Sequence, residues 1–347
     1  MTAAVQPTAG RIEIGTPGSR RLVDRVLRIR ELALLVILAV LIGGTELGNH
    51  RFLSTQGVKD LLLNAAILVI LAAGEATVVI TRNVDLSIGS VLGITAFAAG
   101  DHLNRGGSPV VAVLLAVALG AGLGLVNGTL VSFGRVPSLV VTLGTLYIVR
   151  GLDSIWVGSR EIVAHDLPAG YVKLGHGGPF LLPYLAVIGL VLLLALGFYL
   201  HSYRGGREFY AIGSHPEAAQ LAGVAMRRRI TAAYVLCGLL AGVGGVLYLA
   251  RFGNVDSGTG SGYELTVISA VVVGGVAFTG GSGTVYGAAL GGLLLTSINS
   301  ALPSLGVSSS WEGAIDGFLL LAAIAVDRAL ALRVAHILRR KRGARRG

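Results

Sequence analysis

The sequence has few charged residues and almost no cysteine. Only 13% of its 347 residues are charged, whereas a soluble domain carries about 25%. The single cysteine, Cys237, lies in an apolar run and excludes an intramolecular disulfide and a thiolate metal site. With 53% hydrophobic residues and a mean hydropathy of +0.76, the chain lacks the polar surface of a soluble protein. The composition therefore predicts an integral membrane protein.

Signatures of catalysis are also missing. Glycine is never followed by lysine, so the chain has no Gly-x4-Gly-Lys-Ser/Thr phosphate-binding loop and is not expected to hydrolyse ATP. The seven histidines include no pair at zinc-ligand spacing on a helix. We therefore predict no catalytic, cofactor-binding or metal-binding residue in this chain, and we do not expect an enzyme.

The chain contains a series of long hydrophobic segments instead. A helix needs roughly 20 apolar residues to cross about 30 Å of hydrocarbon. Some segments are uncharged over that length, and further segments with a weaker hydropathy signal bring the total to ten. The predicted fold class is an all-α polytopic membrane protein with about ten transmembrane helices. The predicted spans are 32–49, 61–81, 86–100, 110–133, 137–156, 180–200, 231–250, 264–279, 284–303 and 313–327.

The distribution of lysine and arginine orients these spans. An even number of spans puts both termini on one side, where Lys and Arg number 21 against six on the other side. Basic residues gather in cytoplasmic loops, so both termini are predicted to be cytoplasmic. Topology and attraction to membrane lipid then explain the net charge of +10, and no nucleic-acid partner is expected. We divide the chain into a cytoplasmic basic tail, 1–30, a transmembrane domain, 31–328, with a cytoplasmic loop at 201–230, and a cytoplasmic basic tail, 329–347.

Several glycines recur at four-residue spacing within the predicted spans. Glycines four apart lie on one face of a helix and let two helix backbones approach closely in lipid. We interpret these sets as helix-packing surfaces. They are Gly120, Gly124 and Gly128, then Gly238 and Gly242, and finally Gly287 and Gly291.

A polar cluster at residues 81–90 separates two apolar runs with almost no loop between them. Polar groups at this depth are costly unless protein or a water-filled cavity surrounds them. A broken helix satisfies that constraint. Asp85, Ser87 and Ser90 could cap the restarted helix through their side-chain oxygens, or they could take part directly in a transport pathway or gate.

Glu75 lies inside the preceding span, and an ionisable residue within a membrane is a functional candidate by default. Arg82 or Arg150 could instead pair with it structurally. Uncharged polar residues in other spans could bind a hydroxyl-rich solute or form hydrogen bonds between helices. The predicted pathway or gate residues are Glu75, Asp85, Ser87, Asn127, Thr142, Thr145 and Asn299. Asn64 and Tyr147 are further polar residues of this kind.

The cytoplasmic loop contains the pattern of a short helix. Pro216 favours the first helical position, Ser214 and Glu217 stand at capping-box spacing, and Gly223 would end the helix. A short capped helix between two spans can dock in a groove of a partner protein.

This loop resembles the coupling loop of the permeases of ATP-binding-cassette (ABC) importers. The similarity lies in Glu217-Ala218-Ala219 followed after three residues by Gly223. Its surroundings resemble the ribose, rhamnose and autoinducer-2 branch, and the resemblance covers about residues 32–328. Arg82-Asn83 departs from the two glycines of many ribose-type members and favours the rhamnose and autoinducer-2 members. The other similar segments are Thr81 to Ser90, Arg135 to Thr145, Gly262 to Leu265, Val273 to Gly275 and Gly280 to Thr284.

The resemblance implies a multi-pass permease of the bacterial inner membrane that translocates a monosaccharide or sugar-like solute. Its implied partners are a second permease subunit, identical or paralogous, cytoplasmic ATPase subunits carrying ATP-Mg, and an extracytoplasmic sugar-binding protein. The outer segments 157–179 and 251–264 would meet that binding protein. The residues implied in ATPase coupling are Pro216, Glu217, Ala218, Ala219 and Gly223.

Two other classes of protein fit parts of the pattern. An ion-coupled secondary transporter would also use broken helices and intramembrane acids such as Glu75 and Asp85. The loop at 217–223 argues against that alternative. A membrane-embedded enzyme would need a nucleophile paired with a histidine, and no convincing pair is present.

Overall fold

The computed structural model describes residues 17–179 and 181–343 as an all-helical protein. Within these residues the only extended pairing is an isolated antiparallel bridge between Ile162 and Val255. The α-helices are α1 (Pro17–Gly48), α2 (Thr55–Ile80), α3 (Ile88–Asn104), α4 (Pro109–Ser132), α5 (Ser138–Val157), α6 (Ala169–His176), α7 (Tyr184–Ser202), α8 (Arg204–Ser214), α9 (Pro216–Leu221), α10 (Met226–Phe252), α11 (Tyr263–Val273), α12 (Val285–Ser304) and α13 (Glu312–Gly343). Short 3-10 helices span Ala164–Asp166 and Ser309–Trp311.

Eight of these helices contain a segment long and apolar enough to cross a membrane, which confirms the predicted all-α polytopic fold. The segments are Glu31–Gly48, Thr55–Ile80, Pro109–Ser132, Ser138–Val157, Tyr184–Ser202, Met226–Phe252, Val285–Ser304 and Ser309–Val326. The other two predicted spans coincide with the shorter helices α3, of 17 residues, and α11, of 11 residues. The number of spans and the cytoplasmic side of the termini stay predictions.

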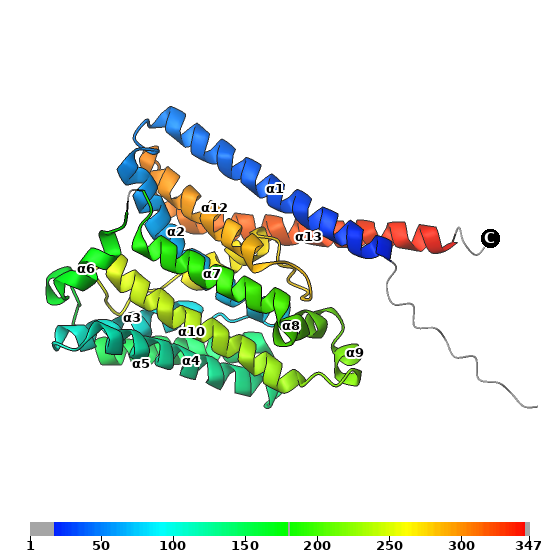
Figure 1. Cartoon of the computed structure of the whole chain (residues 1–347), viewed down its shortest axis with the longest axis horizontal. Helices are drawn as coiled ribbons and strands as arrows, with labels where there is room; N and C mark the ends of the chain where they lie inside the picture. The colour runs from blue at the N-terminus through cyan, green and yellow to red at the C-terminus, as the bar shows by residue number, and fades with distance from the viewer. Residues whose placement is uncertain (1–16, 180, 344–347) are drawn as a thin grey trace, which may run out of the picture.

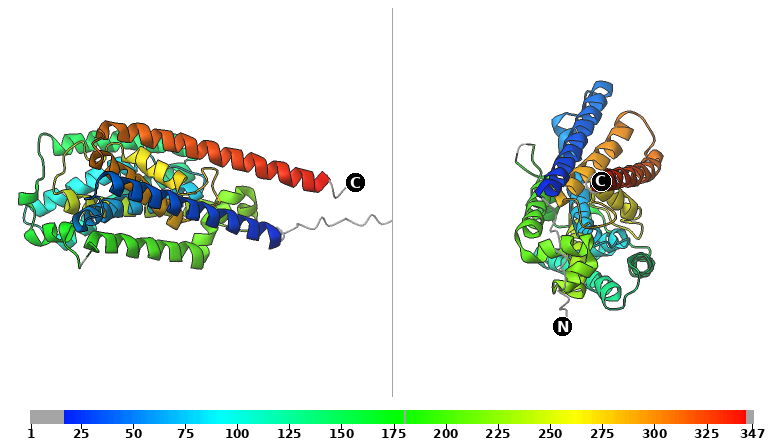
Figure 2. Two further views of the ribbon diagram at one scale, coloured as in Figure 1. Left: turned by 90° about the horizontal axis from the view of Figure 1, so that it is seen from above. Right: turned by 90° about the vertical axis from the view of Figure 1, so that its right-hand side faces the viewer.

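The long helices run along the long axis of the molecule (Figures 1 and 2). The start of α1 and the end of α13 lie at the same end of the bundle as α8 and α9, whereas α6 lies at the opposite end (Figure 1). We call these the α9 end and the α6 end. Residues 1–16 of the predicted basic tail lie outside the described residues, as do residues 344–347, and α1 begins at Pro17.

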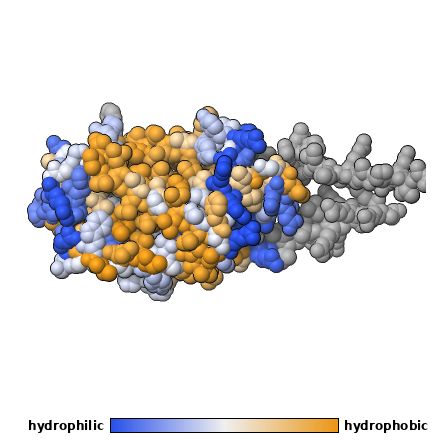
Figure 3. All heavy atoms as spheres, turned by 90° about the horizontal axis from the view of Figure 1, so that it is seen from below, coloured by the Kyte–Doolittle hydropathy of each residue, from blue (hydrophilic) through white to orange (hydrophobic). Residues whose placement is uncertain are grey.

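The outer surface carries a broad hydrophobic band with hydrophilic residues at both ends (Figure 3). Large apolar side chains such as Val40 on α1, Leu114 on α4, Ile155 on α5 and Phe318 on α13 are largely exposed. Exposed apolar area of this extent is unfavourable in water and favourable in lipid. The surface therefore fits a bilayer.

Helix α2 forms the centre of the bundle, and from Leu61 onward most of it is buried between α7, α10 and α12. Helices α4 and α10 pack closely against each other, and their contact confirms the predicted glycine packing. A Cβ atom on Gly120 would lie 2.2 Å from the carbonyl oxygen of Gly238, and one on Gly124 would lie 2.2 Å from that of Tyr234. The backbones of α4 and α10 touch because neither helix carries a side chain there.

The second glycine pair packs on α11. A Cβ atom on Gly291 would lie 2.0 Å from the carbonyl oxygen of Ala270, and one on Gly287 would lie 2.3 Å from that of Gly274. The predicted span 264–279 was too long, because α11 ends at Val273. Left-handed glycines, including Gly275 with φ 95°, take the chain out of the helix and into an irregular segment, 274–284.

Candidate functional site: coupling segment, buried polar network and polar cavity

The helix break predicted at residues 81–90 is present. Helix α2 ends at Ile80 and α3 begins at Ile88. Between them Arg82 adopts φ 67°, a left-handed conformation that a residue other than glycine rarely takes. The chain therefore turns sharply inside the bundle, and Asp85 and Ser87 are buried there.

The break is organised by two carboxyl groups and a serine. Glu75 of α2, with no exposed surface, accepts a hydrogen bond at Oε1 from the backbone N–H of Asp85 over 2.9 Å. Asp85, 2% exposed, accepts at Oδ1 from both the backbone N–H of Ser87 at 2.9 Å and its hydroxyl at 2.6 Å. Buried polar groups satisfied in this way hold one local conformation.

Helices α4 and α5 extend this network. The side-chain amide of Asn127 donates to Oγ of Ser87 over 2.9 Å, and the hydroxyl of Thr145 donates to Oδ1 of Asn127 over 2.6 Å. Thr142 lies beside them and donates to the carbonyl oxygen of Ser138 over 2.9 Å. We call Glu75, Asp85, Ser87, Asn127 and Thr145 the buried polar network. Of the seven predicted pathway residues, only Asn299 lies elsewhere.

Two of the alternatives left open for this region are not found. Ser87 occupies the N-cap position of α3 but makes no side-chain cap bond, because its hydroxyl is engaged by Asp85 and Asn127. Neither arginine pairs with Glu75. The guanidinium of Arg82 donates to backbone carbonyls at the end of α8, and that of Arg150 donates to the carbonyl of Thr259.

Glu75 meets a different partner. Its Oε2 lies 3.7 Å from the thiol of Cys237 on α10, which donates to it. No ion pair to Glu75 is present among the described residues. Glu75 is therefore built into the centre of the bundle as a hydrogen-bonding group.

Helix α9 confirms two of the three predicted helix signals. Pro216 stands at its first position, and Gly223, with φ 77°, follows its end. The N–H of Gly223 donates to the carbonyl of Gln220 and that of Val224 to the carbonyl of Ala219, each over 3.0 Å, as at many helix C-termini.

The predicted capping box was wrong. Ser214 is the last residue of α8, and the N-cap of α9 is His215, which makes no side-chain cap bond. The hydroxyl of Ser214 donates instead to the carbonyl oxygen of Gly281 over 3.2 Å. A long-range partner thus replaced the local one that the spacing suggested.

The α9 surface is open. Glu217 and Ala218 are exposed, and the side chain of Leu221 is 90% exposed, whereas Ala219 is buried against the rest of the chain. Helix α9 therefore presents one large apolar side chain on its free surface, outside the membrane-crossing segments. We call α8 and α9 together, residues 204–221, the coupling segment.

The coupling segment is tied to the helix break. The guanidinium of Arg82 donates to the carbonyls of Gly213 and Ser214, the second over 2.9 Å. The N–H of Gly281 donates to the carbonyl of Ile80 over 2.9 Å. The end of α2, the end of α8 and the glycine-rich segment 274–284 therefore meet at one point at the α9 end.

Glu208 fastens α8 to the start of α10. It accepts from Arg204 over 2.8 Å and from Arg229. Burial alone would raise the pKa of Glu208, but the hydrogen bonds and charges of Arg229 and Arg204 outweigh it and hold the pKa below its ordinary value. The carboxylate therefore stays ionised at neutral pH, and its ion pair with Arg229 connects α8 to α10.

The two outer segments of the sequence prediction lie together at the α6 end. Ile162 and Val255 exchange both backbone hydrogen bonds over 3.0 Å. Tyr171 of α6 donates its hydroxyl to the carbonyl of Val246 on α10 over 2.6 Å. The segments 157–179 and 251–264 thus form one surface opposite α9.

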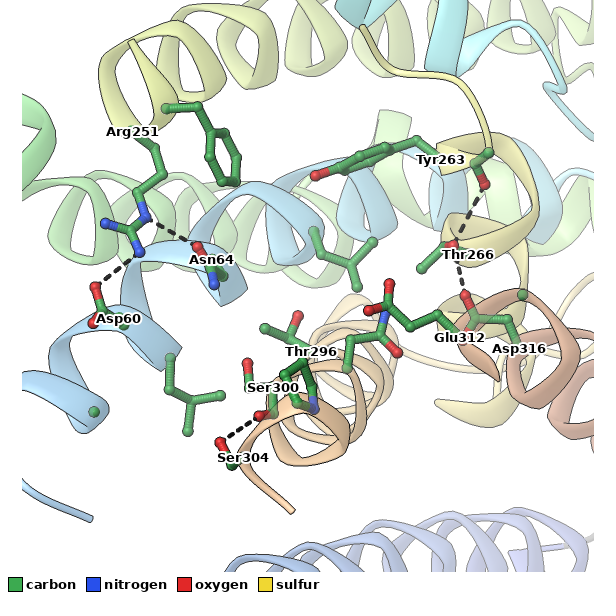
Figure 4. Close-up of a pocket in the computed structure, with 18 of the residues that line it drawn as sticks. Asp60, Asn64, Arg251, Tyr263, Thr266, Thr296, Ser300, Ser304, Glu312 and Asp316 are labelled. Carbon is green, nitrogen blue, oxygen red and sulfur yellow. Dashed lines mark hydrogen bonds and ion pairs between the residues drawn. The ribbon is translucent and has the colours of Figure 1, made fainter. Parts of the chain in front are cut away.

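A polar cavity of about 880 Å³ opens near the same end, between α2, α10, α11, α12 and α13 (Figure 4). Arg251 lines it and donates to Oδ1 of Asn64 over 3.0 Å and to Oδ1 of Asp60 over 2.8 Å. Asn299 lines it too, away from the buried polar network. The other polar lining residues include Thr266, Thr296, Ser300, Ser304, Glu312 and Asp316.

Sequence reasoning missed most of this cavity. It singled out Asn64 and Asn299 but not Asp60, Arg251 or Asp316. One signal was present, since Thr296, Asn299, Ser300 and Ser304 recur at spacings of three and four and therefore share a face of α12.

A helical bundle with a lipid-facing surface, a buried polar interior and a polar cavity has the features of a membrane permease. Residues 57–324 match a family described as "Branched-chain amino acid transport system / permease component". The chain belongs to this family of ABC importer permeases, which are inner-membrane proteins.

Relatives similar over most of the chain carry a more specific name. The "Autoinducer 2 import system permease protein LsrC" of Enterobacter sp. (strain 638) is 37% identical over 302 residues, which are 87% of this chain and 88% of that protein. The proteins of the same name from Photorhabdus laumondii and Salmonella typhi are 35% and 37% identical, covering 91% and 90% of this chain and 94% and 88% of their own length. No solved structure matches the chain.

Proposed function

We propose that this chain is the permease subunit that moves a small sugar-like solute of the autoinducer 2 type inward across the membrane. Its partners would be ATPase subunits at the α9 end, a second permease subunit, identical or paralogous, and a solute-binding protein at the α6 end. The names of the relatives support the solute class. ATP-Mg would bind the ATPase subunits.

The observation that carries the proposal is the exposed coupling segment and its attachment to the helix break. An ATPase that docks on α9 can act on the bundle only through contacts between the coupling segment, α8 and α9, and the other helices. Arg82 supplies such contacts at the end of α8, and Asp85, three residues further, belongs to the buried polar network. ATP-driven closure would therefore reach the centre of the bundle by a short route.

Coupling also has an energetic requirement. A partner shifts an equilibrium only by its difference in affinity for the two states. The ATPase must therefore prefer a different position of α9 in the outward-open and the inward-open state. Glu217 and Leu221 are exposed on α9, so their contacts with the ATPase would differ between the two positions of the helix.

Reconstitution in proteoliposomes tests the proposal. The tagged chain is isolated from gently solubilised native membranes, the proteins that accompany it are identified by mass spectrometry, and uptake of autoinducer 2 is measured with and without ATP. We expect an ATPase to accompany the chain and uptake to require ATP. Recovery of the chain alone, with uptake driven by an ion gradient, would reverse the proposal in favour of a secondary transporter.

Exchange of Glu75 for glutamine distinguishes an ATP-driven importer from an ion-coupled secondary transporter. Because Glu75 accepts from the N–H of Asp85 and has no ion pair among the described residues, a glutamine oxygen can replace Oε1. The glutamine NH₂ group would then face the sulfur of Cys237, which is a weak acceptor, so only the weak bond from the thiol is exchanged. We expect Glu75→Gln to keep ATP-driven uptake within about twofold of wild type. Glu75→Leu leaves the buried N–H unpaired, which costs about 1–3 kcal/mol, and should lower the melting temperature.

The control is the yield of each variant by size-exclusion chromatography. A tenfold or greater loss of uptake in well-folded Glu75→Gln would mean that the acid itself carries a proton or ion. That result would contradict the hydrogen-bonding role of Glu75 and strengthen the ion-coupled alternative.

Arg82 provides a test of the connection between α9 and the helix break. Glycine adopts φ 67° without strain, so Arg82→Gly removes the guanidinium and its two carbonyl contacts while it relaxes the backbone. We expect normal insertion but about a tenfold decrease in solute transported per ATP hydrolysed, as for a loss of about 1.4 kcal/mol of coupling free energy.

Arg135→Gly is the matched control. Arg135 also has a positive φ, 56°, and no side-chain hydrogen bond of Arg135 is found in the described part of the chain. Its replacement should leave the ratio of transport to hydrolysis unchanged. Equal ratios in both variants would show that Arg82 plays no part in coupling.

A further inference from the structure

We propose that the cavity at the α6 end is a solute-binding site within the permease itself, and that it takes a neutral, polyhydroxylated molecule held mainly by oxygen acceptors of α12 and α13. This inference rests on the proposed function and adds the site and the chemistry of its ligand. Helices α2, α10, α11, α12 and α13 all contribute to its wall (Figure 4).

Unpaired acceptors in the wall point to a ligand. Asp316 lines the cavity and is only 4% exposed, and its Oδ1 has no hydrogen-bond partner among the described residues. Oδ1 of Asn299, from the facing helix α12, is also buried without a partner there. Buried acceptors are nearly always paired in folded proteins. A molecule that brings hydroxyl donors would satisfy both.

The remaining oxygen of Asp316 orients the carboxyl group. It accepts from the hydroxyl of Thr266 on α11 over 2.7 Å (Figure 4). This bond leaves Oδ1 as the free acceptor of the pair. Asp316 therefore has the arrangement of a binding residue held in place by a neighbour.

The charges of the wall disfavour an anion. Two basic residues, Arg51 and Arg251, are among the described residues that line the cavity. Arg251 is already bound by its two partners on α2, and Arg51 is exposed. The opposite wall carries the carboxyl groups of Glu312 and Asp316, which would repel an anionic solute.

The size and lining of the cavity disfavour a bare cation. Its volume of about 880 Å³ lies in the range of about 300–1,000 Å³ that is typical of small-molecule sites. The described residues contain no group of three His, Cys, Asp or Glu that could hold a metal ion. Phe52, Phe252 and Tyr263 also line the cavity and add apolar surface that the C–H groups of a sugar can contact.

Asp316→Asn is the decisive variant. The asparagine oxygen can still accept from Thr266, while its NH₂ group puts a donor where the free acceptor stood. In proteoliposomes that contain the complete transporter, with autoinducer 2 as the probe, we expect uptake to fall at least tenfold. ATP hydrolysis stimulated by the loaded binding protein should stay within twofold of wild type, because α9 is unchanged.

Two variants of α12 complete the test. Asn299→Leu removes the second acceptor at similar volume and should lower uptake in the same way, which decides the question if Asp316→Asn does not assemble. Ser297→Ala is the matched control, because Ser297 lies on the same helix, donates only to the carbonyl of Leu293 and does not line the cavity. Its uptake should equal that of wild type.

Each other outcome overturns the inference in a distinct way. Wild-type uptake by both Asp316→Asn and Asn299→Leu would remove the cavity from the solute pathway while the proposed function stands. Uptake that depends on a sodium or proton gradient and loses this dependence in Asp316→Asn would assign the cavity to a cation. Absence of ATP-driven uptake by the wild-type transporter would refute the proposed function itself.

Discussion

Replacement of Gly238 by leucine is expected to abolish accumulation of the folded protein. A Cβ atom at this position would lie 2.2 Å from the carbonyl oxygen of Gly120 and 3.1 Å from the Cα of Gly124. Overpacking a core typically costs about 1–3 kcal/mol, and more when the surroundings cannot move. Backbone faces backbone here, so no side-chain rotation relieves the clash and α4 and α10 must separate.

Size-exclusion chromatography of the detergent-solubilised protein measures this effect. We expect less than a tenth of the wild-type yield in the monodisperse peak. Gly144→Leu is the control, because Gly144 is an exposed glycine of α5, and no atom outside the adjacent backbone of its own helix lies within 4 Å of the position that a Cβ atom would occupy there. Leucine is also the better helix former by up to about 1 kcal/mol. A Gly238→Leu yield within twofold of wild type would contradict the tight α4–α10 contact.

The second large effect is expected at the coupling segment. Leu221 of α9 is 90% exposed and lies outside the membrane-crossing segments. Its change to aspartate should leave insertion and thermal stability unchanged, because the side chain packs on little of its own chain. Removal of a central apolar anchor of an interface costs about 2 kcal/mol or more, which corresponds to about a thirtyfold loss of affinity.

Recovery of the ATPase with tagged Leu221→Asp, together with ATP-driven uptake, measures that loss. Both quantities should fall sharply, and Leu221→Met should restore both because methionine keeps the apolar volume. Full recovery of the ATPase and full uptake with Leu221→Asp would exclude α9 from the contact with the ATPase.

The sequence by itself determined the features that depend on local chemistry. Hydrophobic runs of membrane-crossing length located every long helix, because hydrocarbon tolerates few other backbone conformations. The exception in length is at the two ends of the chain, where α1 begins at Pro17 and α13 ends at Gly343, well outside the predicted spans 32–49 and 313–327. Pro216 and Gly223 marked the two ends of α9 through their own backbone preferences. Glycines at four-residue spacing identified the close face of α4, because helical periodicity alone puts them on one side.

Only the tertiary structure decided which distant groups meet. Ser214 stands at capping-box spacing from Glu217, but its hydroxyl donates to the carbonyl of Gly281. Arg82 was a possible partner of Glu75, but its guanidinium donates to carbonyls at the end of α8. These outcomes depend on the packing of helices far apart in the chain, where a long-range partner competes with a local one of similar strength.

The polar cavity depends on the tertiary structure for the same reason. Asp60 and Arg251 are separated by 191 positions, and Thr266 and Asp316 by 50. Each is one polar residue at the end of an apolar helix, and no local pattern distinguishes a cavity wall from an ordinary solvated helix end. Their common site exists because the helix ends converge at the α6 end, and that convergence is set by the packing of α2 at the centre of the bundle and not by any one segment.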